Sequence, residues 1–168
     1  MAVLITEAVF KAKTATNENV DWTLVEPYVY VAQETQLKEI LGENLYNKMQ
    51  TDFTNSTLSG AYLTLYNSYV VNFVAFAGMA VVLPHIWVRY AKGNIIKMGS
   101  DRGEIVSKED LTWLIARHNE SAQLFGNRMI DYLCANSQNY PEYFTNISGE
   151  VMPDSSSRTN RGLSMNLY

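Results

Sequence analysis

The side chains that could do chemistry in this chain are few, and they complete no familiar catalytic or metal-binding set. His85 and His118 are its two histidines. His118 has no cysteine or carboxylate one helical turn away on the same face, so the histidines do not predict a metal site. No serine, histidine and acid follow the order of a catalytic triad. We interpret both histidines as packed, hydrogen-bonded side chains, and we expect neither an active site nor a cofactor.

A glycine-rich stretch and the single cysteine offer no better site. A phosphate-binding loop ends in Gly-Lys-Ser/Thr, but no lysine separates Gly99 from Ser100, and Lys97 lies on the wrong side. Cys134 cannot form an internal disulfide, so we interpret it as a small core side chain rather than a reactive thiol. The N-terminal residues do not resemble a secretory signal. We therefore expect folding in a reducing cytoplasm.

The strongest signal in the sequence is a long segment without charge. Residues 53–88 contain no Asp, Glu, Lys or Arg, although 18% of the chain is charged. We expect a helix from about residue 61 to a break or kink at Pro84, with a last turn or two through Tyr90. A helix that is apolar on every side either crosses a membrane or is enclosed by other helices or neighbouring subunits. Polar residues within it and weak flanking positive charge favour enclosure.

Two helices are expected before this segment. Thr6 can cap a short helix reaching about Lys13, and Asp21 can cap a second one over residues 22–41. Gly42 ends the second helix in the left-handed conformation that glycine adopts cheaply, and ENLYNKMQTDF begins another. This pair is a helix-turn-helix only in shape, because its second helix lacks clustered arginine and lysine. The net charge of -4 also argues against a broad nucleic-acid-binding surface.

A change of composition at residues 93–106 predicts a β-hairpin or an extended loop that projects from the helical body. Three glycines punctuate two short β-prone runs, 94–98 and 104–106. A two-stranded ribbon is marginally stable alone, so we expect it to pair across subunits. The residues expected to pair are Ile95, Ile96, Ile105 and Val106.

A last long helix follows the hairpin. Ser107 and Asp110 form a capping box, and the helix should run to about Asn136. Its apolar residues recur at steps of four and three, which makes one packing face. Together with the uncharged helix, this face should supply contacts between subunits. The residues predicted for inter-subunit packing are Tyr69, Phe73, Phe76, Leu111, Ile115, His118 and Phe125.

The end of the chain predicts an extended tail. Residues 145–168 are polar and turn-rich with isolated apolar side chains, a composition that does not fold on itself. Ordering a backbone costs roughly 1–2 kcal/mol per residue, so the tail needs another surface, most simply another protein chain. The residues predicted for docking are Met152, Arg158, Arg161, Leu163, Met165, Leu167 and Tyr168.

The predicted fold is mainly α. It is a helical bundle formed by a domain of residues 1–144, with a long central helix, a small β-hairpin insertion at about residues 93–106 and the extended tail 145–168.

Several of these segments together resemble a known family. They are the N-terminal LIT, the VD before a helix that contains Pro27 and Ala32-Gln33, the LGENLY turn, the uncharged helix, the glycine-rich strand segment and the closing NYPEYF box. Over about residues 3–144 the chain resembles small head-tail connector proteins of tailed bacteriophages. The likeness is greatest to the ring proteins below the portal in crAss-like and related Bacteroidales phages. The long tail departs from the shorter members.

The resemblance implies a mostly helical, non-enzymatic subunit that is repeated about twelve times in a ring. Such a ring continues the portal channel, retains packaged DNA and gives the tail a binding face. The implied partners are further copies, the portal protein and other connector or tail proteins, while genomic DNA passes through the lumen without specific binding and no membrane is involved. The implied location is the portal vertex of the virion, after assembly in the host cytoplasm. A stand-alone helical interaction module and a small membrane protein are the alternatives.

Overall fold

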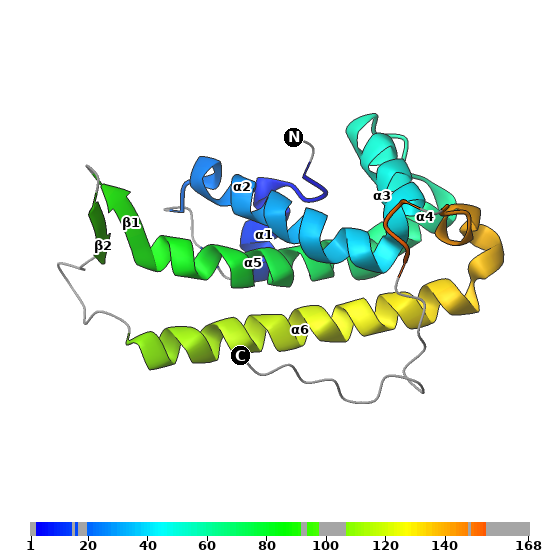
Figure 1. Cartoon of the computed structure of the whole chain (residues 1–168). Helices are drawn as coiled ribbons and strands as arrows, with labels where there is room; N and C mark the ends of the chain where they lie inside the picture. The colour runs from blue at the N-terminus through cyan, green and yellow to red at the C-terminus, as the bar shows by residue number, and fades with distance from the viewer. Residues whose placement is uncertain are drawn as a thin grey trace.

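The computed structural model describes residues 3–14, 16, 20–91, 94–97, 107–147 and 149–153. This part of the chain is mainly helical, as predicted (Figure 1). In chain order the elements are α1 (Glu7–Thr14), α2 (Trp22–Ala32), the π-helical turn η1 (Gln33–Leu37), α3 (Lys38–Thr54), α4 (Gly60–Leu65), the π-helical turn η2 (Tyr66–Val70), α5 (Val71–Trp87), β1 (Val88–Ala91), β2 (Asn94–Lys97), α6 (Lys108–Ala135), and the 3-10 turns η3 (Ser137–Asn139) and η4 (Pro141–Phe144).

The helix starts are set by the predicted capping residues. A carboxylate oxygen of Asp21 accepts a hydrogen bond from the Thr23 amide at 3.0 Å at the start of α2. Ser107 Oγ accepts one from the Asp110 amide at 3.0 Å at the start of α6. These bonds satisfy amides that have no partner within their own helix. Gly42, with φ +73°, divides α3 where the sequence predicted a helix end.

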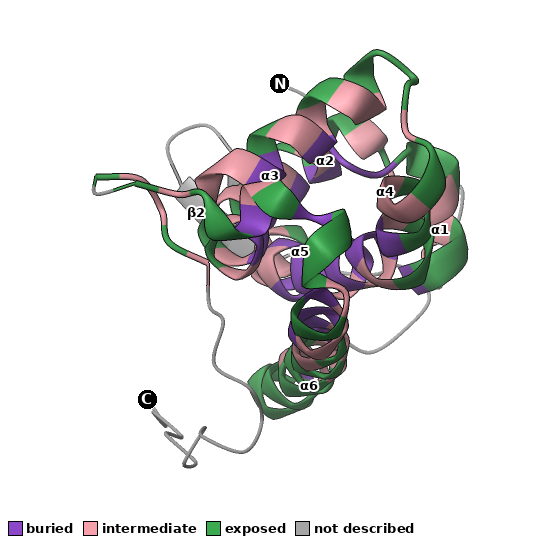
Figure 2. Ribbon diagram, turned by 90° about the vertical axis from the view of Figure 1, so that its right-hand side faces the viewer, coloured by how far each residue is buried: buried purple, intermediate pink, exposed green. Residues whose placement is uncertain are grey.

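Helix α5 is the middle layer of the bundle. Helix α6 runs antiparallel along one side of it and α2 lies along the opposite side, while α1 covers a further part (Figures 1 and 2). Ten of the seventeen residues of α5 are buried. The uncharged helix is thus enclosed largely by its own chain, so its burial does not require a second subunit.

Helices α5 and α6 approach closely where Gly126 meets Phe73. A Cβ atom at position 126 would lie 3.1 Å from Phe73 Cε2 and 3.0 Å from Ile40 Cδ1. Any larger residue would have to displace one of these side chains. Because Gly126 leaves this space, the Phe73 ring is only 4% exposed.

The continuous helix from Gly60 to Trp87 is long and apolar enough to cross a membrane. The rest of the chain nevertheless buries 61% of its most apolar window. The core helix of a soluble protein has the same length and composition, so this test alone does not assign a membrane span.

The prediction for the end of this helix is wrong. Pro84 lies inside α5, which continues to Trp87, and Val88 is already extended with φ -118° and ψ 142°. A last turn or two was expected after Pro84 through Tyr90; residues 85–87 are helical, but 88–90 belong to strand β1. Proline removes one backbone donor, and this close to a helix terminus the loss affects few bonds.

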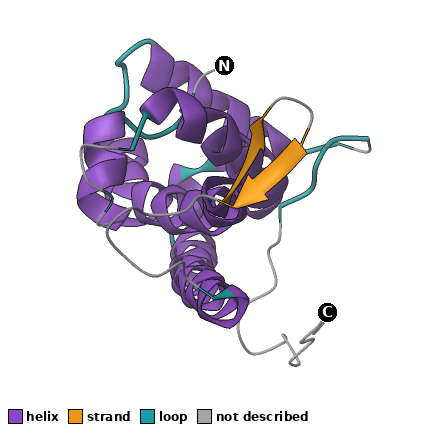
Figure 3. Ribbon diagram, turned by 90° about the vertical axis from the view of Figure 1, so that its left-hand side faces the viewer, coloured by secondary structure: helices purple, strands orange, loops and turns teal. Residues whose placement is uncertain are grey.

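The strand pairing also differs from the prediction. Strand β2 pairs with β1 as an antiparallel ribbon at the end of α5, with Ile95 opposite Tyr90 and Ile96 opposite Arg89 (Figure 3). We predicted pairing of residues 94–98 with 104–106. The run before β2 supplies its partner, because the uncharged helix ends early enough to free Val88–Ala91 for a strand. The other two predicted pairing residues, Ile105 and Val106, lie outside the described residues.

We predict that Phe73→Asp prevents folding of the bundle. The Phe73 ring is enclosed beside Gly126, so the substitution both empties this space and buries an unpaired carboxylate. The loss should exceed the about 3–5 kcal/mol typical of removing a buried phenylalanine ring. Urea unfolding followed by circular dichroism measures it. Thr64→Asp, at an exposed position of the same continuous helix, is the control and should unfold like the parent protein.

Candidate functional site

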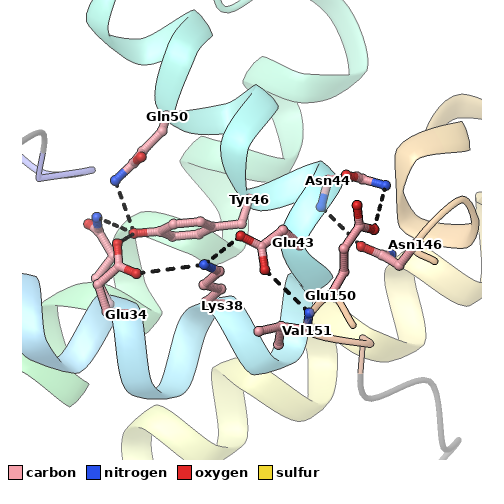
Figure 4. A network of polar contacts seen from close by, with 10 residues as sticks. Glu34, Lys38, Glu43, Asn44, Tyr46, Gln50, Asn146, Glu150 and Val151 are labelled. Atoms are coloured by element: carbon pink, nitrogen blue, oxygen red, sulfur yellow. Dashed lines mark hydrogen bonds and ion pairs between the residues drawn. The ribbon is translucent and has the colours of Figure 1, made fainter. Parts of the chain in front are cut away.

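The LGENLY turn forms the best-defined polar site in the described part of the chain. Leu41 and Leu45 point into the core, and Gly42 has φ +73° and ψ 165°. Few residues other than glycine adopt this backbone conformation. The sharp change of direction leaves Glu43 and Asn44 facing residues 145–147 and 149–153, which we call the return segment (Figure 4).

Glu43 holds the return segment through both its backbone and its side chain. The Glu43 amide donates to the Val151 carbonyl at 2.9 Å. The Val151 amide donates back to Glu43 Oε2 at 3.3 Å. Two bonds between the same two residues fix the separation and the orientation of the two backbones. We call this pair, together with the contacts of Asn44, the clasp.

Asn44 adds three further hydrogen bonds to the clasp. Its amide donates to Asn146 Oδ1 at 3.0 Å, and its Nδ2 donates to the Thr145 carbonyl at 3.1 Å and to Glu150 Oε2 at 3.3 Å. The same Glu150 oxygen accepts from the Ile147 amide at 2.8 Å. The return segment is therefore folded on itself and bound to α3 at several points.

A buried amide connects the N-terminal residues to α3. Gln33 is fully buried; its Oε1 accepts from the Leu4 amide at 2.8 Å and its Nε2 donates to the Tyr46 hydroxyl at 2.7 Å. The Tyr46 hydroxyl donates to Glu34 Oε1 at 2.6 Å and accepts from Gln50 Nε2 at 3.0 Å. Burial, reinforced by the Glu34 carboxylate, raises the pKa of Tyr46. The phenol thus stays protonated and acts as a hydrogen-bond donor, not as a base or nucleophile.

The ion pair between Lys38 and Glu43 links this network to the clasp. Lys38 Nζ lies 2.7 Å from Glu43 Oε1 and 4.0 Å from Glu34 Oε2. The hydrogen bond from Lys38, followed by that from the Val151 amide, lowers the pKa of Glu43. The same bond to Glu43 raises the pKa of Lys38. Both side chains therefore stay charged around neutral pH, where Glu43 can accept from both partners.

The NYPEYF box is held on the other side of the same junction. The Tyr140 hydroxyl donates to the Ala61 carbonyl at 2.8 Å, and the Tyr62 hydroxyl donates to Glu142 Oε2 at 2.7 Å. The Tyr62 and Tyr140 rings meet edge to face with centroids 5.4 Å apart. Tyr140 and Tyr143 are fully buried. This box therefore anchors the end of α6 to α4 and starts the return segment.

The seven residues predicted for inter-subunit packing lie mainly on the seam between α5 and α6 of one chain. Tyr69 stacks on Tyr132 with centroids 4.9 Å apart, and Phe76 stacks on Phe125 at 5.8 Å. The placements of the seven are as follows: Phe73 and Leu111 are buried, while Tyr69, Phe76, Ile115, His118 and Phe125 are half-buried.

For Phe73 and Leu111 the inter-subunit prediction is therefore wrong. The apolar periodicity on each helix was recognised, but the partner of each stripe is the other helix of the same chain. For the five half-buried residues, a role between subunits remains a prediction.

The histidines lie in apolar surroundings. Burial lowers the pKa of His118, whose ring centroid is 6.1 Å from that of Phe76. His85 stacks on Tyr28 with centroids 4.0 Å apart. Within the described ranges, no group of three or more His, Cys, Asp or Glu side chains could hold a metal ion.

Cys134 is exposed, so its prediction as a core side chain is wrong. Each helical residue is turned by about 100° from the one before it. Leu133 occupies the buried position, and its neighbour is consequently turned out of the core.

The predicted tail residues separate into two groups. Met152 lies in the return segment, where its side chain is 60% exposed. The other six, Arg158, Arg161, Leu163, Met165, Leu167 and Tyr168, lie outside the described residues. The first part of the predicted tail is bound to its own chain by the clasp, so it does not need a foreign surface to be ordered.

A surface hollow of about 350 Å³ lies between the start of α3 and α6. Ile40, Phe73 and Ile130 supply its apolar lining, and Glu39 and Asn127 are among its polar residues. The residues that line this hollow include no nucleophile beside a base, so they offer polar and apolar contacts but no catalytic pair.

Comparison with known proteins places this arrangement in a family. Residues 37–151 match the family of unknown function named DUF6712. The chain belongs to this family. No curated protein and no solved structure matches it.

The extent of the DUF6712 match agrees with the geometry of the clasp. The match begins in η1, includes Glu43 and Asn44, and ends at Val151. Glu43, Asn44 and Val151 thus all lie within the residues matched by the family. The domain boundary we predicted after residue 144 therefore falls inside the folded unit, because the return segment belongs to it.

We predict that Gly42→Ala destabilises the domain and detaches the return segment. A Cβ atom there would lie 2.8 Å from Asn146 Nδ2 and 2.9 Å from Pro153 Cδ, in a backbone conformation that alanine rarely adopts. The strain alone should cost about 1–3 kcal/mol. Thermal unfolding measures the stability, and hydrogen exchange at Val151 reports on the clasp.

Gly60→Ala is the matched control for this variant. Gly60 also has a positive φ, +54°, but no atom lies within 4 Å of a Cβ built there. Gly60→Ala should lower the stability of the domain, but the Val151 amide should stay protected from hydrogen exchange. Equal protection of Val151 in both variants would contradict the role we assign to Gly42.

Proposed function

We propose that this DUF6712 protein is a structural subunit of a ring between the portal and the tail of a tailed bacteriophage. In that ring it continues the DNA channel and docks neighbouring connector or tail proteins. The proposal rests first on the resemblance of the LGENLY turn, the uncharged helix and the NYPEYF box to connector proteins of this kind.

The observation that carries the proposal is what the two motifs do in the fold. Glu43 and Asn44 of LGENLY bind the return segment, and Glu142 of NYPEYF binds Tyr62. The polar groups of both motifs form hydrogen bonds within the protein and are not free to bind a ligand. Tyr46 and Tyr62 stay protonated because burial raises the pKa of each. Motifs of this type support a structural role, since the groups with perturbed pKa values serve the scaffold and not a reacting ligand.

The surface of the bundle offers a second line of support. Large apolar side chains are exposed at several places, among them Trp113 at 60% and Leu24 at 55%. The five half-buried residues of the predicted packing set also retain some accessible surface. These side chains are accessible to a neighbouring protein. A net charge of -4 is compatible with DNA sliding past without being held.

The membrane alternative has one observation in its favour, the long apolar helix Gly60–Trp87. A membrane protein would need detergent for extraction and would pellet with lipid vesicles. A connector subunit should remain soluble without detergent.

The ring proposal predicts a closed assembly. We expect the protein, co-expressed with the portal protein of its own genome, to form a ring of about twelve copies on the portal, as connector subunits do. Native mass spectrometry and electron microscopy measure the symmetry. Portal particles that lack the protein, together with a monomer that never associates, would contradict the proposal.

We also predict that two truncations of the C-terminal tail differ in their effects on stability and docking. Removal of residues 154–168 should leave the thermal unfolding of the body unchanged but prevent docking to the neighbouring ring or tail, because the clasp ends before this cut. Removal of residues 145–168 should lower the unfolding temperature as well, since it deletes the clasp partners of Glu43 and Asn44. If the shorter truncation still joined complete virions, the assigned docking role of the tail would be wrong.

A further inference from the structure

The return segment contributes no side chain to the hydrophobic core. Tyr140 and Tyr143 of the NYPEYF box are fully buried, but no described residue after Tyr143 belongs to the core or packs against it. Within the return segment, Ile147 is 67% exposed and Met152 is 60% exposed. We call the chain up to Tyr143 the body. Detaching the return segment from the body would take no side chain out of the core.

Two residues of α3 hold the return segment by hydrogen bonds. Glu43 makes two bonds of the clasp and Asn44 makes the other three (Figure 4). Pro153 adds a close contact with Gly42. The side-chain bonds of the clasp are exposed or half-buried, so water can replace each partner when the segment moves away. A segment held in this way, without buried apolar contacts, opens at a much lower free energy than the whole domain.

The Glu43 carboxylate keeps a partner when the return segment is detached. Lys38 Nζ lies 2.7 Å from Glu43 Oε1, whereas the Val151 amide donates to the other oxygen, Oε2. Lys38 and Glu43 both belong to α3, so their ion pair does not depend on the return segment. Opening of the clasp therefore leaves the charge of Glu43 paired on the body.

Bonds within the return segment hold it together as one piece. Glu150 Oε2 accepts from the Ile147 amide at 2.8 Å, and the Glu150 amide donates to the Ile147 carbonyl at 3.1 Å. The bonds from Thr145 and Asn146 back to the NYPEYF box are 3.4 Å long and join residues three or four apart. Neither set requires α3, so the segment can leave α3 without unfolding itself or the box.

We propose that the return segment is a detachable strap, which opens as a unit while the body stays folded. Opening adds residues 145–153 to the length of chain between the body and the predicted docking residues after 153. In extended conformation, these residues reach up to about 30 Å further. The use of this reach in docking rests on the ring function proposed above. The opening itself rests on the contacts of the described residues.

Hydrogen exchange of the full chain, followed by NMR, tests the opening. The Val151 amide donates to Glu43 and is protected only while the clasp is closed. It should exchange at least about a hundredfold faster than the amide of Ala77, a fully buried residue of α5. Urea below the unfolding transition should leave the Val151 rate unchanged, because opening a short segment exposes little surface. Equal rates with equal urea dependence would overturn the proposal.

A glutamate-specific protease gives an independent readout with a control in the same chain. Glu150 lies in the strap, whereas Glu142 lies in the box, where Tyr62 donates to it at 2.7 Å. The protease should cut after Glu150 while the circular dichroism of the body is unchanged, and after Glu142 only on unfolding. Cleavage at both sites at one rate, or at Glu150 only when the body unfolds, would contradict a separate strap.

Two glycine variants separate the strap from the body. Gly149 has φ +101° and no atom lies within 4 Å of a Cβ built there, so Gly149→Ala strains the strap alone. It should speed exchange of the Val151 amide roughly tenfold. Gly60→Ala strains the body and should speed exchange at Ala77 but not at Val151. An unchanged Val151 rate in Gly149→Ala, or equal acceleration of both amides in Gly60→Ala, would overturn the strap.

Docking is measured by titrating portal particles with the full chain. An apparent affinity scales with the fraction of molecules in the binding-competent state. If docking uses the open strap, Gly149→Ala should bind more tightly than the parent, by about the factor that it adds to the Val151 exchange rate. Unchanged binding with faster exchange would overturn the link to docking while the ring function stands. Failure of the parent to bind portal particles would overturn the ring function, and the exchange and protease results would still decide the strap.

Discussion

The structure depends on covering a helix that has no charged side chain on any side. Most apolar side chains of helix α5 must be removed from water, so they need apolar partners on several sides of the helix. The chain meets this requirement with α6 along one flank, α2 along the other and α1 between them. Small residues at the contacts, such as Gly126 against Phe73, allow the helices to come close enough to exclude water.

This arrangement changes which surfaces are available to partners. The apolar stripes that are easiest to see in the sequence, on α5 and on the inner side of α6, are largely used within the chain. What remains accessible is a set of separate apolar side chains on α2, α4, the end of α5, α6, η4 and the return segment. In this bundle the most hydrophobic segment therefore marks the core of the chain itself.

Local features of the fold could be predicted from the sequence because their causes are local. Asp21 and Ser107 cap helices within three residues of themselves, and Gly42 breaks α3 through its own backbone. The end of α5 was placed too late because Val88, Arg89 and Tyr90 pair as a strand with β2, a contact that the pattern of the helix itself does not show. Cys134 was misplaced because adjacent helical positions differ by about 100°, a shift that composition does not reveal.

The clasp could not have been predicted in the same way. Its partners, such as Glu43 and Val151, are separated by 108 positions. No periodicity connects two polar residues at that distance, and the return segment has the composition of a free tail. The LGENLY and NYPEYF motifs were the available signal. They marked the two ends of the junction but did not show that residues after the second motif return to the first.

The clasp can form only late in protein synthesis. A chain emerges from the ribosome beginning with its N-terminus, so Glu43 and Asn44 are released long before the residues they bind. Closing such a long loop is entropically costly and slows folding relative to local helix formation. The helices preceding α6 therefore emerge while the flank of α5 that α6 covers is still open to water, and that flank is covered only when the last third of the chain has been made.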